Sequence, residues 1–508
     1  MNAVNWKKRL LAGGIRTVLW AVGAALFLLL AYIVCFHRTD LWHLWLPASA
    51  NNDEVIYNRQ LAGVLAGGQP QGVYGYNEGR AAAGHFGTWG PVLFFLYAMP
   101  GLLTGAGVNA MFWCNALFAV AGWLFFVWGT RLTLRGQLLT GTTLLCCWYP
   151  VQQIFTGTAE PLQFFLIFAI LGATQALQRQ IAWRWGWVLA IACALTTITR
   201  AYTVLFWLYP IVLLWKRHRP LAWASVGGAL LSAGGYLLVS QKFSAAFFGQ
   251  SIDFTIFTLL GSGHPLQALA YSAGHLGEQV QYLWQEAIAP TLQGDFRELG
   301  LTALLVLFLL AVQVVCLIVD IRRKRAVSFE VCTLLVVVVS LLGLLEMYEM
   351  YAMARHFVML AFFLAAALAC SHPRSLVVCL VWVLLLPYHW QTATLPTYDA
   401  AMDAQLQTVA SALTERDAAQ QSDDPWAHTL AYAFRDDVFH GYLYAVPDRM
   451  GIQFDQNTYL ADEDNPIHAQ YVMVGHGSDT EKRLVTQQWQ MLVSTEDLAV
   501  YERPENLQ

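Results

Sequence analysis

Charge is scarce in this sequence. Only 12% of its 508 residues are Asp, Glu, Lys or Arg, whereas 57% are hydrophobic. A water-soluble protein of this length carries roughly twice that share of charge. The shortage excludes an ordinary soluble enzyme and indicates that a lipid bilayer is the solvent for most of the chain. The formal net charge of −4 is mild, so no nucleic-acid partner is expected.

The polar segments contain no cysteine. All nine cysteines lie in or beside apolar runs, which excludes a disulfide framework and a Cys-x-x-Cys metal site. The histidines of the C-terminal part have no regular ligand spacing. No Walker loop or nucleotide-binding fingerprint is present, so ATP-driven chemistry is not expected.

Apolar runs of near-spanning length fill the first 390 residues: 17–36, 88–106, 108–130, 136–150, 161–178, 185–200, 202–215, 221–240, 299–319, 328–347, 353–370 and 375–390. Basic clusters mark the cytoplasmic side of a membrane protein. They are Lys7-Lys8-Arg9, Arg131/Arg135, Arg179/Arg184, Lys216-Arg217-His218-Arg219, Arg322-Arg323-Lys324-Arg325 and Arg374.

The run 88–106 decides the topology. If every run crosses the membrane, Arg131 and each later basic cluster fall outside. If 88–106 is a juxtamembrane or re-entrant segment, every cluster falls inside. Gly90-Pro91 and Pro100-Gly101 interrupt this run, which favours a short surface helix. We therefore predict about eleven transmembrane helices, with the N-terminus in the cytoplasm as a retained signal anchor.

The predicted fold class is a polytopic α-helical membrane protein with a small C-terminal extracytoplasmic α/β domain. The membrane module covers residues 1–390, with outer loops at about 37–107 and 241–298, and the C-terminal domain covers residues 391–508. Within that domain the patterns predict helices at 399–421 and 479–490 and strands at 441–446, 470–474 and 498–501.

Asp53 and Glu54 stand just outside the first apolar run. One interpretation is structural: Asn51 or Asn52 caps a helix whose first-turn acids favour the helix dipole. The other is catalytic, because a carboxylate at the membrane surface can act as a general base on a substrate dissolved in lipid. The two interpretations are compatible, and both stay open on the sequence alone.

Glu160 is the second candidate, and the topology places it on the same outer face. An acid at a membrane boundary that faces the interior of a bundle costs free energy and is a functional candidate by default. The structural alternative is a capping role, because Pro161 suits the first position of a helix.

Arg355-His356 is the third candidate, in a polar interruption near the outer surface. An arginine there can hold a phosphate through paired, charge-assisted hydrogen bonds. The alternative is an arginine that pairs with Glu346 or Glu349. Other basic residues of this face are individually more typical of structural or solvated positions: Arg59, Arg80, Arg200, Lys242 and Arg297.

Together these residues resemble the GT-C glycosyltransferases, and within them the protein O-mannosyltransferase and lipid A aminoarabinose transferase group. Asp53-Glu54-x-x-Tyr57 is similar to that group's first-loop acidic motif, and the segment 87–93 occupies the place of its proline-containing juxtamembrane segment. Glu160 stands where the group carries a second acid, and Arg355 where it carries a basic residue. The family's His-Pro-Pro signature is replaced by Trp89-Gly90-Pro91.

The resemblance implies a membrane glycosyltransferase that uses a polyprenyl-phosphate-linked sugar donor. The sugar would pass, with inversion, to a lipid, glycan or protein acceptor on the outer, periplasmic face of a bacterial inner membrane. Asp53 would be the general base supported by Glu54, and Glu160 would position the acceptor or a metal. The donor phosphate would be bound by four residues: Arg355, His356, Arg59 and Tyr57. A divalent cation, Mg²⁺ or Mn²⁺, is a candidate cofactor between Asp53 and Glu160.

Two rival functions make different demands on the residues. An O-antigen ligase or polymerase would depend on His264, His275 and Arg297 in the second outer loop and would leave Asp53 dispensable. A transporter would place ionisable residues deep within several spans, whereas these spans are largely free of them.

Overall fold

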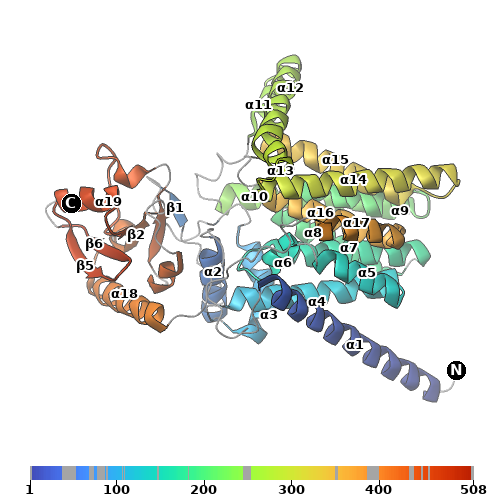
Figure 1. Ribbon diagram of the computed structural model, residues 1–508, viewed down its shortest axis with the longest axis horizontal. Coiled ribbons are helices and arrows are strands. Elements are labelled where there is room, and N and C mark those ends of the chain that lie inside the picture. The colour runs from blue at the N-terminus through green and yellow to red at the C-terminus, as the bar shows by residue number, and fades with distance from the viewer. Residues whose placement is uncertain are drawn as a thin grey trace.

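The computed structural model describes residues 3–36, 53–67, 74–76, 86, 90–105, 107, 109–145, 148–180, 182–243, 253–348, 353–385, 400–433, 440–447, 450–455 and 458–504. A long helical bundle forms one part of the molecule and a sheet domain forms the other, as Figure 1 shows. The N-terminal end of α1 lies at the end of the bundle away from the sheet.

Among the residues that the structure describes, seven helices are long and apolar enough to cross a membrane, as expected of a membrane protein. They are α1 (Ala3–Phe36), α4 (Ala110–Thr130), α7 (Glu160–Arg179), α10 (Arg219–Phe243), α14 (Glu298–Arg322), α15 (Ser328–Met347) and α16 (Met353–Ser371). Shorter helices complete the bundle: α5 (Leu134–Leu145), α6 (Trp148–Ile154), α8 (Trp183–Thr199), η1 (Ala201–Trp207), α9 (Leu208–Trp215), η5 (Pro373–Ser375) and α17 (Leu376–Leu385). The predicted spans at 136–150, 185–200, 202–215 and 375–390 coincide with these shorter helices, so the count of eleven stays a prediction.

The helix α3 (Val92–Thr104) corresponds to the apolar run that charge parity excluded from spanning. Its 13 residues extend only about 20 Å at 1.5 Å per residue, which is shorter than the hydrocarbon core of a bilayer. In Figure 1 it lies beside α2 at the end of the bundle that faces the sheet domain.

The helices α7 and α16 form the centre of the bundle. In their apolar windows 89% and 83% of residues are buried, against 17% in α1 and 22% in α10, so the outer helices present apolar side chains to lipid. The helices α4 and α7 approach closely through glycines. A Cβ on Gly129 would lie 2.1 Å from the carbonyl oxygen of Gly172. Small residues allow such close backbone contact between helices in membranes.

The second predicted outer loop is largely helical. It contains α11 (Thr255–Gly261), α12 (Pro265–Tyr282), the π-helix η3 (Leu283–Ile288) and α13 (Ala289–Leu292). The helices α11 and α12 project sideways from the bundle (Figure 1).

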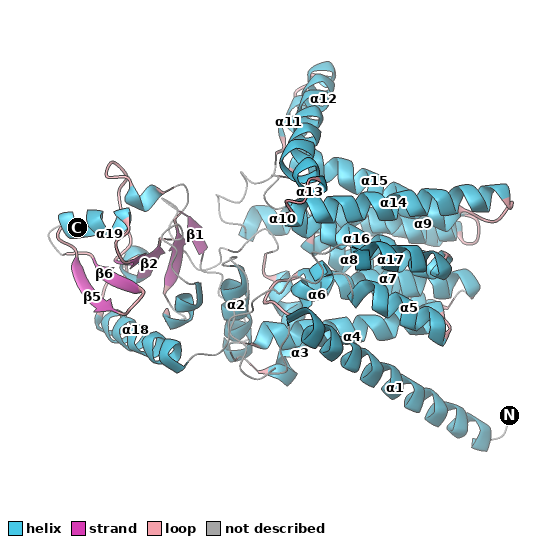
Figure 2. Ribbon diagram, viewed as in Figure 1, coloured by secondary structure: helices cyan, strands magenta, loops and turns pink. Residues whose placement is uncertain are grey.

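The C-terminal domain is built on a six-stranded sheet of order β1-β3-β2-β4-β6-β5 (Figure 2). Its strands are β1 (Tyr74–Tyr76), β2 (Thr429–Tyr432), β3 (Gly451–Phe454), β4 (Tyr471–Gly475), β5 (Gln490–Ser494) and β6 (Leu498–Glu502). The strands β1 to β4 pair in parallel, and β6 pairs antiparallel with β4 and β5. The strand β1 comes from the first outer loop, so the sheet extends beyond residues 391–508.

Helices and 3-10 turns cover the two faces of the sheet. One face packs with α18 (Ala400–Ala419) and η8 (His440–Ala445), and the other with α19 (Asp479–Thr486) and η9 (Tyr459–Ala461). The turn η7 (Pro425–His428) leads into β2. This arrangement confirms a small C-terminal α/β sheet on a helical membrane bundle.

Two local predictions in this domain were wrong. The segment 441–446 is the 3-10 helix η8 rather than a strand, because Tyr442, Leu443, Ala445 and Val446 all face one core, which strand alternation cannot achieve. The helix predicted to reach residue 490 ends at Thr486. The backbone then turns at Gln488, whose φ is 60°, and β5 begins at Gln490.

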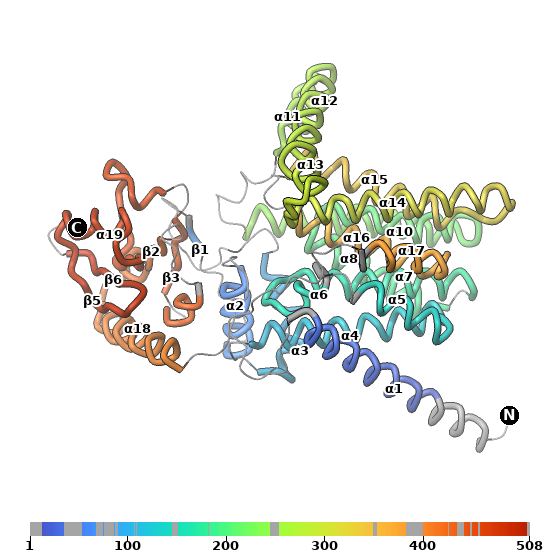
Figure 3. Tube along the Cα trace, viewed as in Figure 1, coloured from blue at the N-terminus to red at the C-terminus, as the bar shows by residue number. Residues whose placement is uncertain are grey.

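The helix α2 (Asp53–Gly67) joins the two cores. Tyr57, Leu61 and Val64 pack into the bundle, whereas Val55 and Ile56 pack into the sheet domain. Spacings of four and three residues place the first set on one helix face. In Figure 3, α2 and β1, both from the first loop, lie between the bundle and the remaining strands. The helix α2 is therefore held from both sides.

Candidate functional site

Four helix ends meet at the end of the bundle nearest the sheet domain. Asp53 begins α2 and Glu160 begins α7. Arg355 lies in the first turn of α16, and Arg200 directly follows α8. Residues that are far apart in the sequence thus form one cluster of two carboxylates and two guanidinium groups, which we call the outer cluster.

Arg355 connects the two carboxylates of the outer cluster. Its Nη1 donates to Oδ2 of Asp53 at 2.8 Å, and its Nε lies 3.3 Å from Oε1 of Glu160 at an angle too poor for a hydrogen bond. Oδ2 of Asp53 also accepts from the hydroxyl of Tyr57, one turn along α2, at 3.3 Å. The Asp53 side chain is 28% exposed, so this carboxylate is fixed in position yet reachable from outside the protein.

Glu160 is the buried anion of the outer cluster, with 1% of its side chain exposed. Its Oε1 accepts from Nη2 of Arg200 at 2.6 Å. A buried carboxylate needs such a partner because desolvation alone would disfavour its charge. Oε2 of Glu160 is buried and has no hydrogen-bond partner among the described residues.

His356 lies behind the outer cluster rather than at its exposed side. It is 5% exposed, and its Nδ1 lies 3.2 Å from Nη1 of Arg200 and 3.0 Å from the hydroxyl of Tyr202. Arginine can only donate, so Nδ1 is an acceptor toward Arg200. His356 and Tyr202 thereby help to orient Arg200, which in turn holds Glu160.

The loop before α7 fixes the position of Glu160. The amide nitrogen of Asn115 donates to the carbonyls of Thr156 and Thr158 at 2.7 and 2.9 Å, and the hydroxyl of Tyr97 donates to Asn115 Oδ1 at 2.7 Å. Gly157 packs directly on α2, since a Cβ there would lie 3.0 Å from Cβ of Glu54. A side chain at this position would push apart the helix ends that carry the two acids.

Glu54 and Arg59 contact other parts of the molecule than Arg355 does. Glu54 is fully buried against the Gly157 loop. Arg59 donates to the backbone carbonyls of Leu443, Val446 and Pro447 at 2.9, 2.5 and 2.9 Å, so its guanidinium anchors η8 to α2. Burial raises the pKa of the neighbouring Tyr444, and its phenol therefore stays protonated at neutral pH.

The structure brings Asp53, Tyr57, Glu160 and Arg355 together as predicted candidates and places His356 one layer behind. Arg59 instead contacts the sheet domain. The predicted capping residues Asn51 and Asn52, the segment 87–89 and Glu349 lie outside the described residues.

Arg200 and Tyr202 were not singled out from the sequence as site residues. Arg200 directly follows a 17-residue apolar helix, and it is only 4% exposed. A charged residue at such a boundary needs a buried partner. An arginine directly after an apolar helix was therefore the sequence feature that could have identified Arg200. The contact with Tyr202 depends on the 3-10 turn of η1, which apolar periodicity does not reveal.

The residues required by the ligase alternative make only local contacts. Nδ1 of His264 lies 3.2 Å from Ser262 Oγ, and the ring of His275 stacks on Tyr271. Arg297 pairs with Asp295 at 2.9 Å and with Glu286 at 3.8 Å. Within the described residues, none of the three forms a hydrogen bond or ion pair with the outer cluster.

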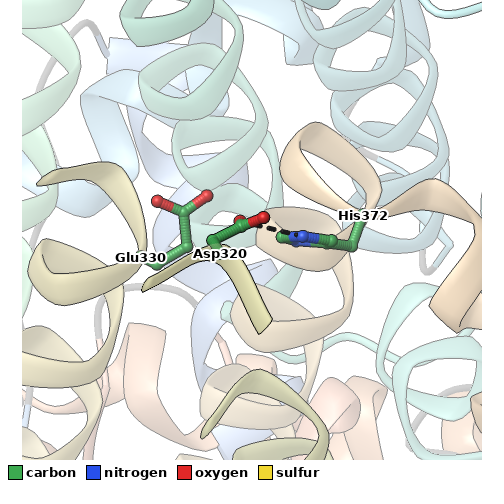
Figure 4. Close-up of side chains that lie close together, drawn as sticks. All are labelled: Asp320, Glu330 and His372. Carbon is green, nitrogen blue, oxygen red and sulfur yellow. Dashed lines mark ion pairs between the residues drawn. The ribbon is translucent and has the colours of Figure 1, made fainter. Parts of the chain in front are cut away.

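A second group of titratable side chains lies at the opposite end of the bundle. Asp320, Glu330 and His372 each offer one ligand atom, and these atoms all lie within 4.8 Å of one another (Figure 4). The described part of the chain therefore contains a cluster that could hold a metal ion, far from the outer cluster.

No protein-family model matches the chain, and no curated protein matches its sequence. Solved structures do match its fold. The chain is similar to the oligosaccharyltransferase of Archaeoglobus fulgidus in complex with Zn and sulfate, with 12% identity and a TM-score of 0.52 over 90% of this chain and 68% of that one. The apo form of that protein matches with a TM-score of 0.51, 12% identity, and 90% and 69% coverage. ArnT from Cupriavidus metallidurans bound to undecaprenyl phosphate matches with a TM-score of 0.42, 14% identity, and 100% and 99% coverage.

The similarity to oligosaccharyltransferase confirms the predicted GT-C resemblance at the level of the fold. At 12% identity it concerns the arrangement of helices and leaves the reaction to be argued from the side chains.

Proposed function

We propose that this protein is a membrane glycosyltransferase of the GT-C type that uses a polyprenyl-phosphate-linked sugar donor. The observation that carries the proposal is the hydrogen bonding of Arg355. Its Nη1 donates to Asp53, whereas its Nη2 is available for a ligand. Nη2 of Arg355 is buried and has no hydrogen-bond partner among the described residues. A buried donor in that state calls for an acceptor, and a phosphate oxygen is the acceptor that arginine geometry suits best.

The proposed reaction is a single displacement at the anomeric carbon. The acceptor hydroxyl gives its proton to Asp53, its oxygen forms a bond to the anomeric carbon, and the bond from that carbon to the phosphate oxygen breaks. Polyprenyl phosphate leaves with the electron pair, and Arg355 takes up the developing negative charge. Because one base and no covalent nucleophile take part, the sugar configuration inverts.

Asp53 suits the role of base because only one of its oxygens is engaged. Oδ2 accepts from Arg355 and Tyr57, whereas Oδ1 accepts no hydrogen bond from the described residues. A general base must reach the proton that it removes, and the partial exposure of Asp53 supports such access. Glu160, which is buried between Arg200 and Arg355, would keep both guanidinium groups oriented and position the acceptor indirectly.

Asp53 and Glu160 also fit a divalent cation. Mg²⁺ and Mn²⁺ prefer oxygen ligands and are commonly held by one or two carboxylates together with substrate phosphates. Oε2 of Glu160 is buried without a hydrogen-bond partner, and Asp53 has an unengaged oxygen. When bound, the ion would add positive charge beside the leaving phosphate.

An apolar groove would suit the polyprenyl chain. It lies between α1 and the helices α4, α5, α7 and α16, and it is lined mostly by apolar side chains, among them Phe27, Trp123, Phe164 and Phe362. Phe164 lies one turn along α7 from Glu160. A lipid chain in this groove would therefore lie close to the outer cluster.

The proposed orientation follows from charge. The basic turn 322–325 and Arg374 lie at the end of the bundle opposite the outer cluster, and such clusters favour the cytoplasmic side. The outer cluster and the sheet domain would then face the periplasm of a bacterial inner membrane. Because α2 packs into both cores, the sheet domain would shape the site that binds a lipid, glycan or protein acceptor.

The test compares Asp53→Asn with Asp295→Asn in the full-length protein, reconstituted in lipid with a panel of radiolabelled polyprenyl-phosphate sugars. We expect Asp53→Asn to lower turnover about 10²- to 10⁴-fold, the range for removing a general base. Asp295 is 59% exposed and, among the described residues, forms an ion pair with Arg297 alone, so its substitution should leave turnover unchanged. Full transfer by Asp53→Asn would refute the base, and loss of transfer in Arg297→Gln alone would favour the ligase alternative.

A further inference from the structure

The inner end of the bundle carries a cluster that the proposed transfer reaction does not use. Asp320 lies in the last turn of α14, Glu330 in the first turn of α15, and His372 at the junction of α16 with η5. We call these three residues the inner cluster. Figure 4 shows Asp320 between the other two, with the imidazole of His372 directed at its carboxylate.

The two carboxylates of the inner cluster are buried, and His372 is partly exposed. Asp320 and Glu330 are 4% and 5% exposed. Two carboxylates in such an environment repel each other and lose their hydration. Two such carboxylates are stable when one of them takes up a proton or when positive charge accompanies them.

The described residues supply too little positive charge. Nε2 of His372 lies 3.0 Å from Oδ2 of Asp320. Arg325 reaches Oδ1 of Asp320 at 3.4 Å, but 58% of its side chain is exposed. Neither residue forms an ion pair with Glu330 within the described chain, and Oε2 of Glu330 is buried without a hydrogen-bond partner.

From this geometry we propose that Asp320, Glu330 and His372 bind one divalent transition-metal ion of the Zn²⁺ class. Each residue offers one ligand atom, and all three atoms lie within 4.8 Å of one another. Ligand atoms around Zn²⁺ stand about 3.3 to 3.6 Å apart, given bonds of about 2.0 to 2.2 Å in a tetrahedral site. Small rotations of three side chains close this difference. One imidazole and two carboxylates suit Zn²⁺ better than Mg²⁺, which prefers oxygen ligands alone.

The ion would tie three helices together and take no part in the transfer. From Glu298 to Asp320, α14 rises about 33 Å at 1.5 Å per residue, which is roughly the thickness of the hydrocarbon core. Glu298 interacts electrostatically with Arg355 and Glu160 of the outer cluster, so the outer cluster lies about a membrane thickness from Asp320. Removal of the ion should loosen the contacts of α14, α15 and α16 at their inner ends and lower thermal stability, while the substrate site stays assembled.

The test measures metal binding on the full-length protein, purified in detergent without a polyhistidine tag and stripped with a chelator. We expect the wild type to bind one more equivalent of Zn²⁺ than Glu330→Gln and His372→Gln, by elemental analysis and by titration. Each substitution should weaken that site at least about 100-fold, because loss of even an indirect supporting residue costs 10- to 100-fold. Glu278→Gln, an exposed glutamate on α12, is the matched control and should bind as the wild type does.

Co²⁺ provides a readout that does not depend on a variant's folding. The stripped wild type loaded with Co²⁺ should show the visible absorption of a low-coordinate site, and Zn²⁺ should displace it. Asp53→Asn should retain both signals, so failure of the proposed transfer reaction would not affect this result. Absence of the Co²⁺ absorption in the wild type, or equal Zn²⁺ stoichiometry and affinity in Glu330→Gln, would overturn the inner metal site.

Discussion

The two ends of the same helices carry buried clusters that differ in their balance of charge. At the outer end, Asp53 and Glu160 form ion pairs with Arg355 and Arg200, and Glu298 at the start of α14 also interacts electrostatically with Arg355. At the inner end, Asp320 and Glu330 are matched within the described residues by His372 and the largely exposed Arg325. The unpartnered guanidinium donor of the outer cluster suits a phosphate, with or without a divalent cation, whereas the inner cluster has no buried arginine among the described residues and suits a cation. The comparison therefore predicts opposite responses to removal of one charge.

Removal of Arg355 should have the largest effect. Arg355→Met leaves Asp53 without its main partner and deprives the leaving phosphate of its cation, and loss of such a group costs about 10³-fold in turnover. Arg355→Lys keeps the charge without the fork geometry and should recover only part of the rate. Transfer from a radiolabelled lipid-linked donor measures both. Equal activity of the Met variant and the wild type would exclude Arg355 from the reaction.

Glu160→Gln should destabilise the protein strongly. It leaves Arg200 without its carboxylate partner and leaves Arg355 paired with Asp53 alone, and loss of one partner from a buried pair costs about 3 to 5 kcal/mol. The double variant with Arg200→Gln should recover part of this stability, because the two residues interact directly. Thermal unfolding of the single and double variants gives the coupling. Additive effects would contradict the contact.

Arg59→Met separates domain anchoring from phosphate binding. Arg59 makes three hydrogen bonds to backbone carbonyls of the sheet domain, so we expect a loss of about 2 to 3 kcal/mol and less than tenfold lower turnover. Protease sensitivity of the sheet domain reports the loosening. A loss of turnover as large as that of Arg355→Met, without loosening, would instead support the predicted role in phosphate binding.

Glu330→Gln should have an effect of opposite sign from that of Glu160→Gln. In the protein stripped of metal, the substitution removes uncompensated negative charge, so the variant should melt a few degrees above the wild type. In the presence of Zn²⁺ the wild type should have the higher melting temperature, because it binds the ion more tightly. Transfer activity should be unchanged. Because this variant lacks the inner metal site, any effect of a chelator on its transfer activity would reveal a metal ion at the outer cluster. A lower melting temperature in the stripped variant would contradict the charge imbalance.

His476 in the exposed sheet domain should give the smallest effect. Its hydrogen bond to the Thr495 carbonyl and its pairing with Glu481 raise the pKa of His476. A raised pKa means that the folded state binds the proton more tightly, so the contribution to stability is present below about pH 6.5 and is lost as the pH rises through the folded pKa. Thermal unfolding between about pH 6 and pH 8 should show a slight decline that His476→Gln removes. If the variant and the wild type show the same dependence of stability on pH, the interaction between His476 and Glu481 does not cause the decline.

Much of the fold was predictable because apolar length and basic clusters act locally. They separated the membrane part from the tail and identified 88–106 as an unusual segment, which forms a helix of only 13 residues. Strand β1 was not predictable, because three residues in a long loop have no periodicity that reveals a partner near residue 452. The segment 441–446 was assigned wrongly as a strand. Its residue types favour a strand, but its apolar side chains all pack into the same core, which a 3-10 helix allows.

Part of the candidate site was predictable, because a charged residue at a membrane boundary costs free energy and is therefore a functional candidate. Asp53, Glu160 and Arg355 were identified on that basis, and they are in contact. Arg59 was grouped with them because it shares their face of the membrane. Its position six residues after Asp53, however, directs it to the sheet domain. The inner cluster carried no sequence signal, since its residues come from three separate helix ends.

The sequence by itself determined that the chain enters a bilayer and which acids and bases border its apolar runs, because the free energy of transfer into lipid depends on each residue's own chemistry. Only the tertiary structure decided which charges meet. An ion pair depends on a few ångströms, and the distance between α2, α7 and α16 is set by packing at Gly157 and in two hydrophobic cores. The same packing left Oε2 of Glu330 without a hydrogen-bond partner among the described residues and thereby distinguished the two ends of the bundle.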